Sequence, residues 1–176
     1  TLDVKTSMNL FKDVNYFGRA ITTYDHKTDK VTPFAFIDVS YSLGKGFDAV
    51  YETQFIDLGD RTLVQPRIGL EYFGQIRNDL SLLAVSTVNF TQDRDQDTTS
   101  ETVVTLKYTP KLTEKLNLLA QEETVTNYGS DGLNFASQNF RLGLASKTLE
   151  GGLAVNLSQT KSDSNQTIGG FLAWKF

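Results

Sequence analysis

Apolar and polar residues alternate through repeated segments of about ten residues, and this pattern constrains the fold more than any other feature of the chain. A period of two places successive side chains on opposite faces of a β-strand, whereas a helix needs a period near 3.6. In the first segment, for example, Leu2, Val4 and Met8 share one face, and polar residues lie between them. Helical spacing is not sustained anywhere, so the sequence predicts an all-β protein.

Eleven segments carry the alternation, and they are joined in turn by tight Gly- or Pro-containing connections and by acidic or polar loops. The segments span residues 1–10, 16–24, 32–43, 47–56, 63–73, 80–90, 102–109, 116–125, 134–145, 152–158 and 167–176. Connections of two alternating kinds indicate antiparallel up-and-down order with two dissimilar ends. The 176 residues are predicted to form one domain, residues 1–176.

Composition excludes several classes of protein. No stretch approaches the roughly 20 apolar residues that a membrane helix needs. The chain has no Cys, so a disulfide framework, a thiolate metal site and a cysteine nucleophile are excluded. With a net charge of −4 and no basic run, nothing favours a nucleic-acid partner.

The aromatic residues and the strand number favour a transmembrane barrel over a soluble one. Aromatic side chains stand at or near strand ends, where membrane barrels carry interfacial girdles. They are Tyr24, Tyr41, Tyr51, Tyr72, Phe90, Tyr108 and Trp174. More than eight strands leave a lumen too wide for apolar side chains to fill, so a polar, wet interior is expected. The predicted fold is an antiparallel up-and-down transmembrane β-barrel.

The last ten residues, TIGGFLAWKF, alternate and end on Phe176. In this the chain resembles bacterial outer-membrane β-barrels, whose last strand commonly ends in Phe and is recognised by the barrel assembly machinery. TLDVK at the start and YSLGKGFDAVYE over residues 41–52 are loosely similar to small monomeric porins of the oligogalacturonate-channel type. The resemblance implies a bacterial outer-membrane location, contact with outer-membrane lipid, and passive diffusion of small hydrophilic solutes or ions, including charged oligosaccharides.

Strand number is left open between ten and twelve. Porins of that type usually have twelve strands, and an even barrel needs both termini at the same end. We favour ten strands over residues 16–176, with residues 1–15 as an additional N-terminal strand or lumen segment. The alternative is one further strand that the alternation does not reveal.

The polar faces carry charged side chains that are candidates for lining the lumen. These are Lys5, Arg19, Asp38, Asp48, Glu52, Arg67, Glu71, Lys107, Glu123 and Arg141. Charges on a confined wall can select ions by sign. Equally, the same charges can pair with one another and brace the barrel.

Catalytic chemistry has little support in the sequence. His26 is the single histidine, and no second constellation or GxSxG motif accompanies it. The acidic run at residues 93–97 lacks the EF-hand pattern. We expect no enzyme activity, no metal and no cofactor. The competing hypotheses are a closed structural or adhesive outer-membrane barrel, a soluble ligand-binding β-barrel and, last, an outer-membrane enzyme that uses His26.

Overall fold

A computed structural model of the chain describes residues 2–25, 30–57, 59, 61–90 and 98–174. The described residues form eleven β-strands, as the alternation predicted. They are β1 (Leu2–Phe11), β2 (Val14–Asp25), β3 (Lys30–Gly44), β4 (Phe47–Asp57), β5 (Thr62–Arg77), β6 (Leu80–Asn89), β7 (Ser100–Tyr108), β8 (Asn117–Gly129), β9 (Gly132–Ala145), β10 (Leu149–Thr160) and β11 (Ser164–Trp174). Within the described ranges, no helix has the length and apolar character needed to cross a membrane.

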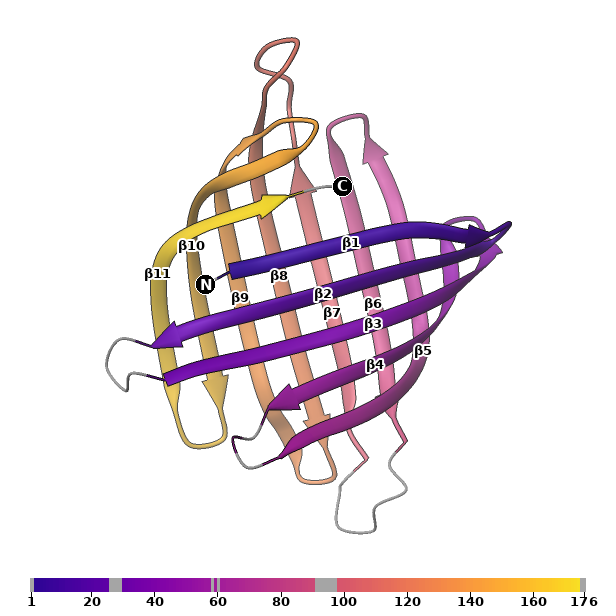
Figure 1. Cartoon of the computed structure of the whole chain (residues 1–176), viewed down its shortest axis with the longest axis vertical. Helices are drawn as coiled ribbons and strands as arrows, with labels where there is room; N and C mark the ends of the chain where they lie inside the picture. The colour runs from indigo at the N-terminus through magenta and orange to yellow at the C-terminus, as the bar shows by residue number, and fades with distance from the viewer. Residues whose placement is uncertain (1, 26–29, 58, 60, 91–97, 175–176) are drawn as a thin grey trace.

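The strands make one sheet in which each strand pairs with the next along the chain. Every pairing is antiparallel, from β1 with β2 to β10 with β11, so the up-and-down order is confirmed. The sheet curls, so that β1 to β4 pass in front of the strands from β6 to β9 (Figure 1). Side chains from opposite walls therefore face each other across the hollow of the sheet.

The sheet is not closed into a barrel in the described residues, because no hydrogen-bonded ladder joins β1 to β11. Strand parity excludes one of the two possible kinds of closure. In an antiparallel meander of eleven strands, β1 and β11 run in the same direction, and an antiparallel closure is geometrically excluded. The count of ten strands favoured from sequence is corrected to eleven in the described residues, since the N-terminal segment is itself a strand, β1, which pairs with β2 from Leu2 to Phe11.

The turn between β3 and β4 shows how a short connection is encoded. Gly44, Lys45 and Gly46 all have positive φ, at 90°, 56° and 84°. Glycine adopts this left-handed region without steric cost, and it is uncommon for other residues. A Cβ on Gly46 would also collide with the carbonyl oxygen of Phe73 on β5. The turn therefore requires glycine at this position for two independent reasons.

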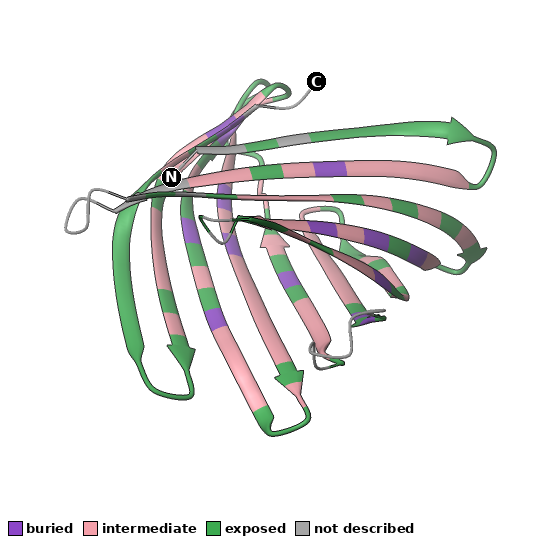
Figure 2. Cartoon of the chain, turned by 60° about the horizontal axis from the view of Figure 1, so that its bottom comes forward, coloured by how far each residue is buried: buried purple, intermediate pink, exposed green. Residues whose placement is uncertain are grey.

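The two faces of the sheet differ in polarity, and their burial is the reverse of that in a soluble protein. Buried, intermediate and exposed residues follow one another along the strands (Figure 2). Residues directly opposite each other in a ladder share a face. The face that carries Arg67 is enclosed by the curl, and we call it the inner face. The buried polar side chains all lie on it: Glu52, Gln54, Arg67, Thr87, Asn89, Thr105, Gln121, Ser137, Arg141 and Glu150.

The opposite, outer face carries most of the large apolar side chains. Ile68 is 55% exposed, Leu142 59% and Leu153 68%. The buried hydrophobic residues among those described are few and mostly small: Val50, Leu119, Ala145 and Ala173. These four belong to the inner face by register. The structure thus has a polar interior and an apolar exterior.

Candidate functional site

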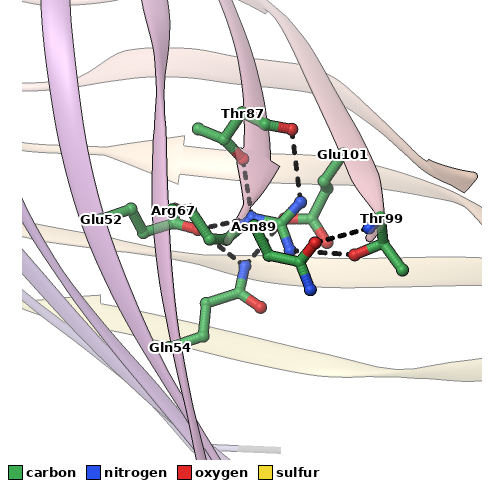
Figure 3. A network of polar contacts seen from close by, with 7 residues as sticks. All are labelled: Glu52, Gln54, Arg67, Thr87, Asn89, Thr99 and Glu101. Carbon is green, nitrogen blue, oxygen red and sulfur yellow. Dashed lines mark hydrogen bonds and ion pairs between the residues drawn. The ribbon is translucent and has the colours of Figure 1, made fainter. Parts of the chain in front are cut away.

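A network of polar side chains lies on the inner face, toward the β4–β5 and β6–β7 connections (Figure 3). Its centre is Arg67, which is fully buried. The Arg67 Nε donates to Thr87 Oγ1 at 2.8 Å and lies 3.5 Å from Glu52 Oε1. The other guanidinium nitrogens donate to the Thr87 carbonyl at 3.4 Å and to Thr99 Oγ1 at 3.5 Å. A buried guanidinium thus has a carboxylate and three hydrogen-bond acceptors around it.

Gln54 connects this network to a strand that is not adjacent to its own. Its Nε2 donates to Glu52 Oε1 at 2.7 Å and to Glu101 Oε1 at 2.9 Å. Gln54 belongs to β4 and Glu101 to β7, so the contact passes over β5 and β6. Contacts of this kind require the side chains to extend over the hollow of the sheet.

Two further ion pairs join distant strands across the inner face. Lys107 on β7 contacts Glu150 on β10, with 2.5 Å between Nζ and Oε1. Arg19 on β2 contacts Glu123 on β8, with 3.5 Å between Nη1 and Oε2. The first pair lies near the tight turns and the second near the middle of its strands. Together with the Arg67 network, these two pairs place side-chain contacts between strands near both ends and near the middle of the strands.

Aromatic side chains share the inner face with the charges. The rings of Phe17 and Phe36 have centroids 5.7 Å apart, and those of Phe34 and Phe36 are 5.9 Å apart. The guanidinium of Arg141 lies over the ring of Phe171, 5.3 Å from its centroid. These rings make one part of the inner wall apolar, next to Arg19, whose ladder partner on β3 is Phe36.

Carboxylates face each other directly on β3, β4 and β5. Asp38 is the ladder partner of Glu52, and Asp48 is the ladder partner of Glu71. Like charges in such positions repel and destabilise a sheet. The Oδ1 atom of Asp38 is buried and has no hydrogen-bond partner. This side of the inner wall is therefore strongly acidic.

The structure brings the lumen candidates predicted from sequence onto one face. The register places Arg19, Asp38, Asp48, Glu52, Arg67, Glu71, Lys107, Glu123 and Arg141 on the inner face. Lys5 is the ladder partner of Arg19, but its side chain lies outside the described part of the chain. Of the two interpretations left open from sequence, pairing and bracing applies to Arg19, Arg67 and Lys107.

Sequence reasoning missed two carboxylates of this face, Glu101 and Glu150. Glu101 was assigned to an acidic loop and Glu150 to a tight turn, whereas β7 begins at Ser100 and β10 at Leu149. The signal that could have found them is parity, since Glu101 is an even number of residues from Thr105 and Lys107. At polar strand ends the residues of both faces are hydrophilic, so apolar and polar residues no longer alternate and the strand cannot be recognised from the pattern.

The outer face includes one charged side chain among its apolar and neutral polar ones. Away from the strand ends, Glu122 is the single charged side chain at an outward position of the described strands. Its ladder partners are Leu106 and Phe140, and its Oε1 accepts a hydrogen bond of 3.4 Å from Thr124. A carboxylate is therefore set among apolar side chains on the exterior.

Some sequence predictions lie outside the described residues. His26, the acidic run at 93–97 and the terminal Phe176 belong to this group. Among the residues that the structure does describe, no group of three His, Asp or Glu side chains is arranged to hold a metal ion.

Comparison with known proteins does not assign the chain to a family. No protein-family model matches the sequence. No curated protein matches it either.

Proposed function

We propose that the chain forms a transmembrane β-barrel of a bacterial outer membrane, with its outer face against lipid and its inner face around water. The inverted burial carries this proposal: Arg67 and Glu150 are enclosed, while Leu142 is more than half exposed. Burying apolar surface away from water stabilises a protein by about 25 cal/mol per Å², and an apolar side chain that stays exposed to water does not contribute this stabilisation. Against the hydrocarbon core of a bilayer an apolar exterior is the favourable arrangement, and barrels in outer membranes carry such a band.

A soluble ligand-binding barrel is the weaker explanation of the same alternation. It needs apolar side chains in its centre and polar ones outside, because the hydrophobic effect is what holds a soluble sheet closed. The described inner face instead encloses Arg67, Asn89 and Gln121. These residues favour a fold whose exterior is solvated by lipid.

Closure of the barrel belongs to the same proposal. Lipid cannot satisfy the free N–H and C=O groups of a sheet edge, so membrane barrels are closed. The Cα atoms of β1 and β11 already come within 8 Å of each other. A twelfth strand between them would need about 9.5 Å, twice the usual strand spacing. Direct parallel pairing of β1 with β11 is therefore favoured, which departs from the even strand numbers of bacterial barrels.

We propose that this barrel functions as a porin. Small hydrophilic solutes or ions, including charged oligosaccharides, diffuse passively through the lumen. Eleven strands exceed the eight whose interior side chains can just fill, which leaves room for water. Passive diffusion needs no catalytic residue, metal or cofactor, since width and wall charge set permeation. The partners are outer-membrane lipid, the permeating solutes and, through the C-terminal strand, the barrel assembly machinery.

A closed structural barrel is a second candidate, favoured by the bridges inside the sheet. Gln54 with Glu101 and Lys107 with Glu150 connect non-adjacent strands on the inner face, and Arg19 with Glu123 crosses the hollow. A sufficiently dense set of such contacts would plug the lumen and leave the barrel to act through its loops.

Reconstitution in a planar lipid bilayer separates these functions. The porin hypothesis predicts stable unitary current steps in potassium chloride, with the refolded protein in detergent as the starting material. A barrel that inserts into vesicles, resists protease there and carries no current supports the closed structural barrel. A chain that is monomeric and folded in buffer without detergent contradicts both membrane hypotheses.

A further inference from the structure

The pair of Arg19 and Glu123 joins opposite walls of the curled sheet. Arg19 comes from β2 and Glu123 from β8, six strands further along an eleven-stranded meander. Their 3.5 Å contact therefore crosses the hollow, whereas Lys107 and Glu150 are only three strands apart and follow one wall.

This contact also constrains the cross-section. A circular barrel of eleven strands is wider than the eight-stranded size at which interior side chains meet. Side chains of β2 and β8 nevertheless touch, so the sheet must be flattened along the line that joins these strands. The narrowest part of the hollow then lies at the level of Arg19 and Glu123.

The surroundings of the pair favour a persistent contact. The side chain of Arg19 is 12% exposed and that of Glu123 is 13% exposed. Phe36 lies beside Arg19 in the β2–β3 ladder, and Thr105 and Asn139 flank Glu123 in the ladders of β8. Charges that are partly removed from water attract each other more strongly than surface charges do. Separating them would leave the Glu123 carboxylate largely buried without the guanidinium of Arg19.

We propose that Arg19 and Glu123 form a strut across the lumen that sets the constriction of the channel. The proposal rests on the porin function and deepens it by naming the two residues that limit permeation. The strut divides the lumen at mid-height, so permeating ions pass beside it. Its removal joins the two sides into one wider passage without removing a residue from the sheet.

The test compares single-channel conductance in planar bilayers for the wild type, R19A, E123A and the double alanine variant. We expect the conductance of the double alanine variant to be about twofold or more that of the wild type, because the two side chains that cross the narrowest section have been removed. The matched control is the double variant K107A with E150A, which removes an ion pair that follows one wall. Its conductance should change by a smaller factor than that of the strut variant.

The charge-reversed double variant, R19E with E123R, distinguishes loss of the strut from a general loss of stability as the cause of a change in conductance. It restores the contact with opposite polarity and should return conductance close to the wild-type level. A double alanine variant that is folded and protease-resistant in vesicles, yet conducts like the wild type, overturns the proposal. So does a reversed pair that folds no better than R19E alone, because the two side chains then do not meet.

Failure of the porin function has a different signature. If the wild type and every variant insert and remain silent, the channel hypothesis fails, and the constriction fails with it. If the wild type is silent and the double alanine variant conducts, the strut is upheld as a plug and the open porin is refuted.

Discussion

Arg67 on β5 and Glu52 on β4 are direct ladder partners, and the Arg67 Nε lies 3.5 Å from the Glu52 Oε1. Neither side chain is appreciably exposed, at 0% and 8%. Thr87 accepts from the same Nε at 2.8 Å. Around Arg67 the inner face is thus held by groups of opposite charge, and the stability of this part depends on keeping both partners.

Replacing Arg67 by Met should lower the free energy of unfolding by about 3–5 kcal/mol, because Glu52 would remain as a buried carboxylate without its cation. Denaturant titration of the protein in lipid vesicles measures the change. Arg77 forms an exposed pair with Asp79, with its side chain 60% exposed, and provides the control. Arg77→Met should change the stability by less than about 0.5 kcal/mol. Equal stability of Arg67→Met and the wild type would contradict the bracing role.

Leu142→Arg should destabilise the barrel in lipid by roughly 2–4 kcal/mol if the outer face contacts the bilayer centre. Leu112, in the connection between β7 and β8, is similarly exposed at 55% against 59% for Leu142. Because interfacial positions tolerate charge, Leu112→Arg should cost only about 0–1 kcal/mol. The difference between the two variants, measured by refolding into vesicles, reports the depth of Leu142. Similar costs at both positions would argue that Leu142 does not face hydrocarbon.

Glu122→Leu should stabilise the protein in lipid by about 1 kcal/mol, because a carboxylate on the lipid face is unfavourable, though less so than an arginine. Glu114 lies in the exposed connection before β8 and serves as the control, since Glu114→Leu should be close to neutral. The comparison uses equilibrium unfolding from the same vesicles. A loss of stability in Glu122→Leu would show that the hydrogen bond from Thr124 to the carboxylate outweighs the cost of placing the carboxylate against lipid.

Asp48 and Glu71 are opposed carboxylates on adjacent strands, so relieving their repulsion should stabilise the sheet. Glu71→Gln is expected to raise the free energy of unfolding by roughly 0.2–1 kcal/mol. High salt screens like charges, and the gain should therefore shrink as potassium chloride is raised. Gln65 lies on β5 like Glu71, and its ladder partner on β4 is the uncharged Gln54. Gln65→Asn is therefore the control, because it changes no charge. A gain in Glu71→Gln that is independent of salt would point to a cause other than repulsion.

Strand identity was predictable because the period of two is a local property of the chain. Each of the eleven predicted segments contains a strand, and among the described residues the predicted and observed bounds differ only at the strand ends. The β5 strand continues to Arg77, and β10 begins at Leu149, before the predicted boundary. Where strands run into polar connections, both faces are hydrophilic and alternation disappears. This is why Glu101 and Glu150 were placed outside the sheet.

The sequence alone determined that the chain alternates between an apolar and a polar face, because side-chain direction in a strand depends only on residue parity. The tertiary structure decided which face is enclosed, since the direction in which a sheet curls is a property of the whole sheet. It also decided that Arg19 meets Glu123 across the hollow. Residues separated by 104 positions come together only after every intervening register has been set.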